Sequence, residues 1–579
     1  MTKAGILALL VLLLAAVPPE APAQDRDEVE PDEVERGLQR RPGVQTDRPE
    51  LPDYEEEQDV PLALPEVDNL ELPRAGLAAA PSLYLKRVLV TDSTVLNADS
   101  VGKAVAPYVD RHVTADELQA LRADLSRLYI DQGYITSGVL LPDQRVADGT
   151  ISYQAVEGRL AEVEVSTDGR LRGSYVRSRL ESVDGDGPLN VERLREELRS
   201  LHQDPLIQRL DSRLLPTRDR GRARLQVAVQ EARAYELDFS VRNDRAPSVG
   251  SEWAELSFVH RNLLGFADRA YLRYGTADGL DDYQLTYAFP VTGRGATLGF
   301  SYANSEAQVV EEPFDRIDIR SEAEEWAVDF VYPWYRSQSR SLTFTASLES
   351  RESNTSLLGV PFSFSPGVQN GNAQISALRL TGDWTDRQAR QVIALRGRVS
   401  VGFDGMSATI NPENPNGIDL PDSEFVTFLG QAQWARRFGD NDHQLIVRAD
   451  LQKTFDGLLP LEKMSIGGLN SVRGYRQNLM VRDNGWIVSA EYRIPAFHSA
   501  DGRSSFQWAV FLDAGRGWNY EFNTPEPKSI ASAGGGFLWT PIPGLKAEVY
   551  LAHGFEDVEF ADEDPQDNGI HVSLTYRLF

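Results

Sequence analysis

Side chains that could carry covalent or acid–base catalysis are scarce in this sequence. Its 579 residues include no cysteine and only seven histidines, which excludes thiolate nucleophiles, disulfides and cysteine-ligated metals. No H-E-x-x-H, G-x-S-x-G or Walker-type motif occurs. A nucleophile with a paired base is therefore unsupported, and we expect neither an enzyme nor a bound cofactor or metal.

Charged side chains are the remaining candidates, and most of them are acidic. The chain has 87 acidic and 59 basic residues, a formal net charge of -28. Phosphate binding needs a basic surface, so nucleic acid is not expected as a partner. Two charged residues lie in short motifs: Arg473 in Val472-Arg473-Gly474-Tyr475, and Asp513 in Phe511-Leu512-Asp513-Ala514-Gly515. An ordinary surface turn bounded by glycine would also account for the first motif.

In the segments that must position these motifs, from Tyr235 to the C-terminus, apolar and polar residues alternate with period two. Sixteen segments place apolar or aromatic residues on one parity and polar residues on the other, as Leu395 and Val399 alternate with Arg396 and Arg398. Alternation alone also fits a soluble sandwich. However, connections after odd-numbered segments are mostly long and those after even-numbered segments mostly short. This asymmetry, with an even number of segments, predicts an all-β membrane barrel of sixteen antiparallel strands over 233–579.

Such a barrel has a lumen too wide for side chains to fill. The longest connection, 456–485, contains Arg473, and the parity of the thirteenth segment places Asp513 and Phe511 on the lumen side. Gly534-Gly535-Gly536 fits a bulge or a close strand contact better than a phosphate loop. The last residue is Phe579, as is common in outer-membrane barrels, although the apolar alternation ends at Leu578. Outer-membrane lipid and the barrel assembly machinery are therefore expected partners.

The N-terminal residues predict export. Residues 1–23 fit a signal peptide, with Lys3, an apolar run over 6–17 and Ala21-Pro22-Ala23 as the cleavage site. A bilayer-spanning helix needs roughly 20 apolar residues, so this run favours a signal peptide over the alternative of a single anchor helix. Residues 24–80 are acidic and rich in proline, which predicts a linker. A short helix fits around 28–39.

Between linker and barrel, a β-α-α-β-β order occurs twice, over 81–158 and 159–232, and predicts two small α+β domains. Thr114 and Glu117 have the spacing of a capping box. Leu118, Leu121, Leu125 and Leu128 follow at helical spacing, and Gly133 marks the end of that helix.

Taken together, these motifs resemble the transporters of two-partner secretion, the haemolysin activator and filamentous haemagglutinin transporter family. The loop and strand motifs around Arg473 and Asp513 carry the resemblance in the barrel. Residues 129–137, 141–144, 148–149 and 156–159 resemble the first periplasmic polypeptide-transport-associated (POTRA) domain of the family, and 187–190 the second. The resemblance covers about 80–579.

The resemblance implies a function and a site. The loop 456–485 would fold into the lumen as a lid, with Arg473 paired to Asp513 beside Phe511 and Gly515. The linker 24–80 would include a plug helix inside the barrel, as in some members of the family. An unfolded partner exoprotein would bind the POTRA domains in the periplasm and cross the outer membrane through the barrel pore. The POTRA sheet edges could accept it as an added strand, or these domains are rigid spacers. A passive solute channel and an outer-membrane protein assembly factor stay open as alternatives, although assembly factors generally carry more periplasmic modules.

Overall fold

The computed structural model describes residues 51–54, 62–63, 82–146, 148–183, 185, 187–293, 295–413, 417, 419–499, 503–558, 560 and 563–579. The chain divides into two units, one of residues 57–233 and one of residues 1–56 with 234–579. The predicted signal peptide, the helix predicted around 28–39 and most of the linker lie outside the described residues.

The first module of the 57–233 unit packs two helices on short sheets. Its elements are β2 (Leu83–Leu85), β3 (Arg87–Thr91), α3 (Ala98–Val105), β4 (Arg111–Val113), α4 (Ala115–Ile130), β5 (Gly138–Leu140) and β6 (Thr150–Val156). The predicted capping box is confirmed, because the Thr114 side chain accepts from the Glu117 amide and the Glu117 side chain accepts from the Thr114 amide. The β-α-α-β-β order predicts one strand before the first helix, whereas the structure has two, β2 and β3, and β2 pairs with β4.

The second module repeats this plan around a four-stranded sheet in the order β1-β8-β9-β7. Its elements are β7 (Arg159–Thr167), α5 (Gly173–Glu181), α6 (Val191–His202), β8 (Ile207–Pro216) and β9 (Arg222–Glu231). The outer strand β1 (Leu62–Ala63) comes from the linker and pairs in parallel with β8.

Three of the sequence motifs meet where these two modules join. Asn190 caps α6 by accepting from the amides of Glu192 and Arg193, and its Nδ2 donates to the Gln132 carbonyl at 3.0 Å. The Leu189 amide donates to the Gly158 carbonyl at 2.7 Å. These bonds tie the end of α4 in the first module to the start of α6 in the second.

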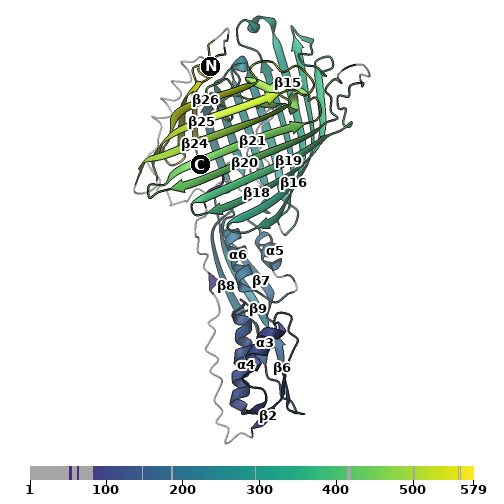
Figure 1. Cartoon of the computed structure of the whole chain (residues 1–579), viewed down its shortest axis with the longest axis vertical. Helices are drawn as coiled ribbons and strands as arrows, with labels where there is room; N and C mark the ends of the chain where they lie inside the picture. Colours follow the sequence, from purple (N-terminus) through teal and green to yellow (C-terminus); the bar gives the residue numbers. More distant parts are fainter. Residues whose placement is uncertain are drawn as a thin grey trace. The chain divides into compact units, whose positions relative to one another are not determined.

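The second unit is a closed antiparallel barrel (Figure 1). Its strands are β10 (Tyr235–Arg242), β11 (Trp253–His260), β12 (Arg269–Ala277), β13 (Leu280–Pro290), β14 (Thr297–Gln308), β15 (Ile319–Arg336), β16 (Arg340–Leu357), β18 (Asn372–Gln388), β19 (Gln391–Gly402), β20 (Val426–Phe438), β21 (His443–Thr454), β24 (Asn484–His498), β25 (Ser505–Trp518), β26 (Ser529–Ile542), β27 (Leu545–Gly554) and β28 (Ile570–Arg577), with the short β17 (Val360–Pro361) beside β16. Within the described residues, each of the sixteen predicted segments lies in one long strand, so the predicted fold class is confirmed.

The connections between β14 and β15 and between β16 and β18, which the sequence predicted as long loops, are in fact largely strand. The strands β15 and β16 have 18 residues each, and their pairing continues from Val328↔Leu348 out to Ile319↔Leu357. Beyond the apolar band both faces of this ribbon are polar, so hydrophobic alternation no longer marks the strands.

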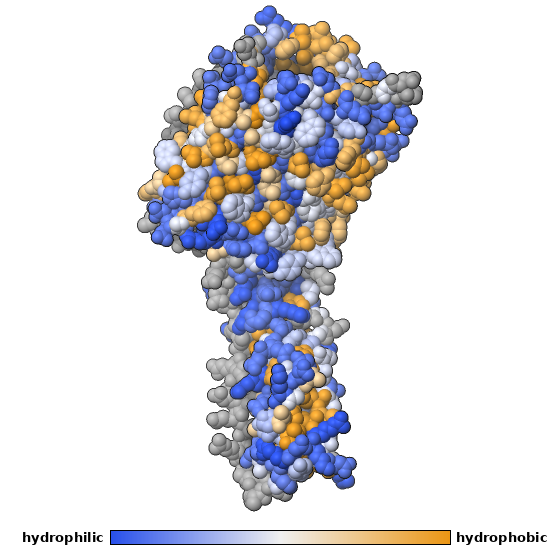
Figure 2. All heavy atoms as spheres, in the orientation of Figure 1, coloured by the Kyte–Doolittle hydropathy of each residue, from blue (hydrophilic) through white to orange (hydrophobic). Residues whose placement is uncertain are grey.

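The two faces of the barrel wall differ in chemistry. Outward side chains are apolar and exposed over a broad band, which is visible as orange patches on the barrel in Figure 2. Inward side chains are polar and buried, among them Glu255, Arg273, Asp329, Glu349 and Arg379. An apolar outer band around a polar interior is the pattern of an outer-membrane barrel.

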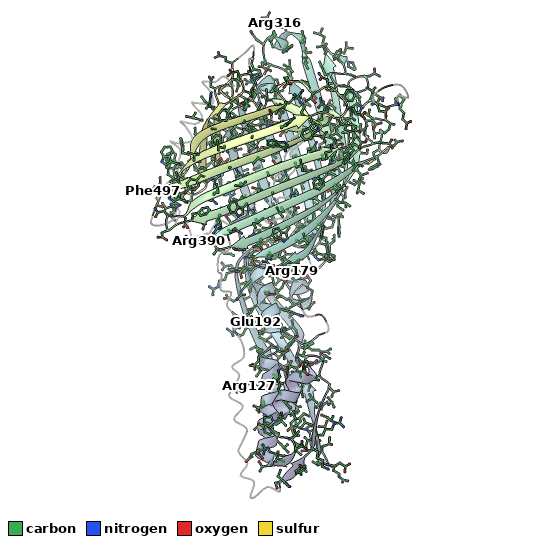
Figure 3. The ribbon with its side chains drawn as sticks, viewed as in Figure 1. Arg127, Arg179, Glu192, Arg316, Arg390 and Phe497 are labelled. Atoms are coloured by element: carbon green, nitrogen blue, oxygen red, sulfur yellow. The ribbon has the colours of Figure 1, made fainter. Side chains whose placement is uncertain are left out.

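The two ends of the barrel also differ. The long loops lie at one end, with Arg316, and the short turns at the other, with Arg390 and Phe497 (Figure 3). None of the described helices has the length and apolar character to cross a bilayer.

Candidate functional site

The loop between β21 and β24 turns into the barrel. It covers residues 455–483, which we name the lumen loop, and contains the short helix η3 (Pro460–Glu462) and the hairpin strands β22 (Met464–Ile466) and β23 (Met480–Arg482). Its side chains Ile466 and Val472 are fully buried and pack with Ile487 of β24 and Ile530 of β26. The loop is therefore attached to the inner wall of the barrel.

Arg473, at the tip of the loop, lies between two carboxylates of the wall. Its Nε donates to Asp513 Oδ2 at 2.8 Å and its Nη2 to Asp513 Oδ1 at 3.0 Å, a bidentate pair with β25. Its Nη1 forms a short bond to Glu491 of β24. Arg473 is 4% exposed, and Glu491 and Asp513 are 1% and 3% exposed. Charge-assisted bonds in so little water are stronger than surface ion pairs.

Two aromatic rings also contact the guanidinium of Arg473. The Arg473 Cζ atom lies 3.5 Å from the ring centre of Phe511 and 4.9 Å from that of Tyr550 of β27. A Cβ atom on Gly534 would lie 2.5 Å from Phe511, and one on Gly536 would lie 2.6 Å from Tyr550. The glycine run on β26 thus makes room for the rings by close strand contact, and its pairing with β25 continues without a bulge.

The other motif residues fit the loop against the wall. Gly474 has φ +90°, and its amide donates to His571 Nε2 at 3.0 Å. The Tyr475 hydroxyl donates to the Ala531 carbonyl at 2.9 Å. Val472 is buried against the backbone at Gly515, where a Cβ atom would lie 2.6 Å from Ile466 and 3.1 Å from Val472. The structure therefore brings all seven motif residues to one place.

A second attachment, which the sequence analysis missed, joins the base of the loop to other strands. Arg379 of β18 forms a bidentate pair with Glu462, in which Nη1 donates to Oε2 at 2.9 Å. Leu458 and Leu459 are fully buried and pack on β18 beside this pair. Burial alone would raise the pKa of Glu462, but the guanidinium of Arg379, helped by Arg351, holds that pKa below its ordinary value.

These contacts give the site its chemistry. The lumen loop is fastened to β18 at its base and to β24–β28 at its tip, by side chains that can separate without breaking a covalent bond. Breaking one side of a buried ion pair is costly, so the seated position should be strongly preferred. Within the described residues, no group of three or more histidine, aspartate or glutamate side chains is placed to hold a metal ion.

Sequence signals for the missed residues were weak. Glu491 shares the inward parity of its strand with many polar residues, and nothing marked it as an arginine partner. His571 and Glu462 lie in no motif. Only the contacts distinguish them from other polar residues of the lumen and its loops.

The fold and the clamped loop define an outer-membrane transport barrel with polypeptide-transport-associated modules. Family models support this class directly. The model for haemolysin secretion/activation proteins ShlB/FhaC/HecB matches residues 221–538, and the model for the ShlB-type POTRA domain matches residues 83–158. The chain belongs to the ShlB/FhaC/HecB family and is a two-partner secretion transporter.

Individual relatives are distant but cover most of the chain. The outer membrane transporter CdiB of Dickeya dadantii (strain 3937) is 21% identical over 518 residues, which span 86% of this chain and 87% of the relative. The hemolysin transporter protein ShlB of Serratia marcescens is 22% identical, with 71% and 72% covered. The solved structure of CdiB from Escherichia coli has the same fold, with a TM-score of 0.65 at 18% identity, covering 87% of this chain and 92% of that one.

Proposed function

We propose that this chain exports a partner exoprotein through its barrel, that the 57–233 unit captures the unfolded polypeptide in the periplasm, and that the lumen loop is the lid of the pore. The observation that carries this proposal is the loop itself, which lies in the polar lumen and is fastened to it only by non-covalent contacts. A permanent plug would not need charged side chains that pair with different strands of the wall, as Arg473 pairs with β24 and β25 and Glu462 with β18. Outer-membrane lipid surrounds the apolar band, and the barrel assembly machinery inserts the barrel.

Capture of an extended polypeptide fits the sheet of the second module. Its strand β8 already accepts an extended segment, since Leu62 and Ala63 pair in parallel with Ser212 and Arg213. Main-chain hydrogen bonds at such an edge make few demands on the sequence that binds. This supports strand addition over a purely spacing role for the two modules.

The energy for export must come from outside the chain. The sequence carries no nucleotide-binding motif. Folding of the exoprotein after it emerges at the cell surface would make the passage one-way, because a folded segment cannot re-enter the pore.

Cysteine cross-linking tests whether the exoprotein passes through the lumen, since the chain has no cysteine of its own. Gln284 and Leu285 are neighbours on β13, the first facing inward at 3% exposure and the second outward at 47%. An exoprotein stalled in transit and carrying a reactive cysteine should cross-link to Gln284→Cys and not to Leu285→Cys. Cross-linking to Leu285→Cys alone, or to neither while export proceeds, would refute passage through the barrel.

Deletion of residues 82–232 separates export from a passive channel. The shortened protein should keep barrel conductance and lose export of the exoprotein. Conductance also shows that the shortened barrel has folded. If export of the exoprotein persisted, capture by the two modules would be wrong.

A further inference from the structure

The barrel closes through its shortest junction. The first and last strands, β10 and β28, pair over five residues, from Asp238↔Arg577 to Arg242↔Ser573. The flanking junctions are longer, with eight pairs between β10 and β11 and seven between β27 and β28. Backbone bonds continue this junction, which we name the seam, at both ends: the Leu578 amide donates to the Leu237 carbonyl at 2.8 Å, and the Asn243 amide donates to the Val572 carbonyl at 3.2 Å.

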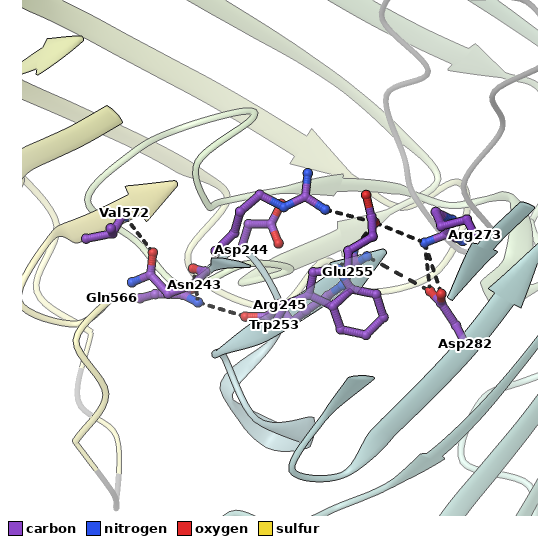
Figure 4. A network of polar contacts seen from close by, with 10 residues as sticks. Asn243, Asp244, Arg245, Trp253, Glu255, Arg273, Asp282, Gln566 and Val572 are labelled. Atoms are coloured by element: carbon purple, nitrogen blue, oxygen red, sulfur yellow. Dashed lines mark hydrogen bonds and ion pairs between the residues drawn. The ribbon is translucent and has the colours of Figure 1, made fainter. Parts of the chain in front are cut away.

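Asn243, just beyond β10, extends the seam at the long-loop end. Its Oδ1 accepts from the Val572 amide at 2.7 Å, and its Nδ2 donates to the Ile570 carbonyl at 2.8 Å. Figure 4 shows Asn243 between Val572 and Gln566. The Asn243 side chain thus takes the place of the Asn243 main-chain carbonyl as partner of the Val572 amide, and that carbonyl accepts from Gln566 instead.

Gln566 contacts both the seam and the lumen loop. Its Nε2 donates to the carbonyls of Asn243 and Arg245, at 2.9 and 2.7 Å, on the β10 side of the seam. Its Oε1 accepts from the amide of Gln477, in the lumen loop, at 2.7 Å. Gln566 is fully buried, so all these bonds are shielded from water.

The neighbours of Gln566 strengthen its link to the loop. Arg476 of the loop forms a bidentate pair with Asp567, with Nη2 to Oδ2 at 2.7 Å, and stacks on Phe560 with its Cζ 3.6 Å from the ring centre. His571, on β28, accepts a hydrogen bond from the Gly474 amide. The tip of the lumen loop is therefore fastened to the same segment that closes the seam.

We propose that Gln566 couples the lid to the seam: the seated lumen loop holds the long-loop end of the β10–β28 junction closed, and departure of the loop loosens it. This rests on the proposed lid role of the lumen loop. Since Gln566 Oε1 and Nε2 belong to one planar amide, loss of the Gln477 contact frees the amide to rotate out of line with Asn243 and Arg245. By linkage, a closed seam in turn favours the seated loop.

Gln566→Glu tests this coupling with an almost isosteric change. A carboxylate can still accept from Gln477 but cannot donate to the two seam carbonyls. Gln144→Glu is the matched control, because Gln144 Nε2 also donates to two backbone carbonyls, those of Pro142 and Ser152, and its Oε1 accepts from the Ser152 amide, all within the first module. Hydrogen exchange of the full-length protein in lipid or detergent is measured for residues 236–243 and 570–578.

Gln566→Glu should speed exchange at the seam by about tenfold or more, while Gln144→Glu leaves the seam as in the wild type. Arg473→Ala, which releases the loop tip, should also speed exchange at the seam, and adding it to Gln566→Glu should have little further effect there. Unchanged seam exchange in Gln566→Glu, or seam exchange equally fast in Gln144→Glu, would overturn the coupling.

The lid role is tested separately by the conductance of Arg473→Ala. If that conductance rises while the seam stays protected, the lid role stands and the coupling fails. If the conductance stays at the wild-type level, the lid role itself fails. The seam assay needs no exoprotein, so its result does not depend on export.

Discussion

Replacing Arg473 by alanine should unseat the lumen loop. The change removes the bidentate pair with Asp513, the bond to Glu491 and the stacking on Phe511. It also leaves the carboxylates of Asp513 and Glu491, which are at most 3% exposed, without the cation that they share. Removing one side of a buried pair costs about 3–5 kcal/mol. Even about 3 kcal/mol multiplies the ratio of unseated to seated loop by about 150.

Single-channel recording in planar bilayers measures this ratio as open probability. Arg396→Ala is the matched control, because Arg396 is 7% exposed and pairs with Asp383 at 2.6 Å but joins two strands of the wall rather than the loop. Arg473→Ala should open far more often than wild type, and Arg396→Ala should match wild type. Arg473→Lys keeps the charge without the planar fork and should be intermediate. Equal open probabilities for Arg473→Ala and Arg396→Ala would refute the reasoning.

Three further changes test the lumen loop and the first module. Gly515→Ala should raise open probability, because its Cβ would press on the seated loop at 2.6 Å, whereas Gly397→Ala, with nothing within 4 Å, should not. Glu462→Gln should raise open probability less than Arg473→Ala, by the about 1–3 kcal/mol of a lost charged hydrogen bond to Arg379. The Glu157 carboxylate accepts from the amides of Thr94 and Val95 and from the Thr94 hydroxyl, so Glu157→Gln should destabilise the first module by about 1–3 kcal/mol, seen as faster hydrogen exchange over residues 82–158.

Two of these predictions extend to pH. Because the folded pKa of Glu462 lies below its ordinary value, its contribution to seating is present near neutral pH and is lost only as pH falls through the lowered pKa, so wild-type open probability should be flat down to about pH 5. The pKa of Glu157 is also lowered, because burial raises it less than the hydrogen bonds from Thr94, Tyr129 and Val95 lower it. The protection of residues 82–158 from hydrogen exchange should thus fall only in acid. It should fall by less in Glu157→Gln than in the wild type. Opening on mild acidification would contradict the assignment for Glu462.

Local patterns accounted for most of the fold. Period-two alternation located every long strand of the barrel because each strand has one face toward lipid and one toward the polar interior. The capping box at Thr114 and the glycine at 133 located the ends of α4. The pattern failed for the outer parts of β15 and β16, where both faces are polar and carry no alternation.

The candidate site was predicted only in part. Motifs pointed to Arg473 and Asp513, and strand parity turned Asp513 inward. The partners Glu491, Glu462 and Arg379 carry no local signature, because a buried carboxylate and a solvated one look alike in a sequence.

The sequence by itself determined which residues form strands and which face of each strand is polar, because those properties depend on neighbours a few positions away. Only the tertiary structure decided which strands hold the lumen loop, and that Gln566 lies between the loop and the closing seam. Those contacts join residues separated by 89 and 323 positions in the chain. Such separations depend on how the barrel closes, and no local pattern of side chains records that.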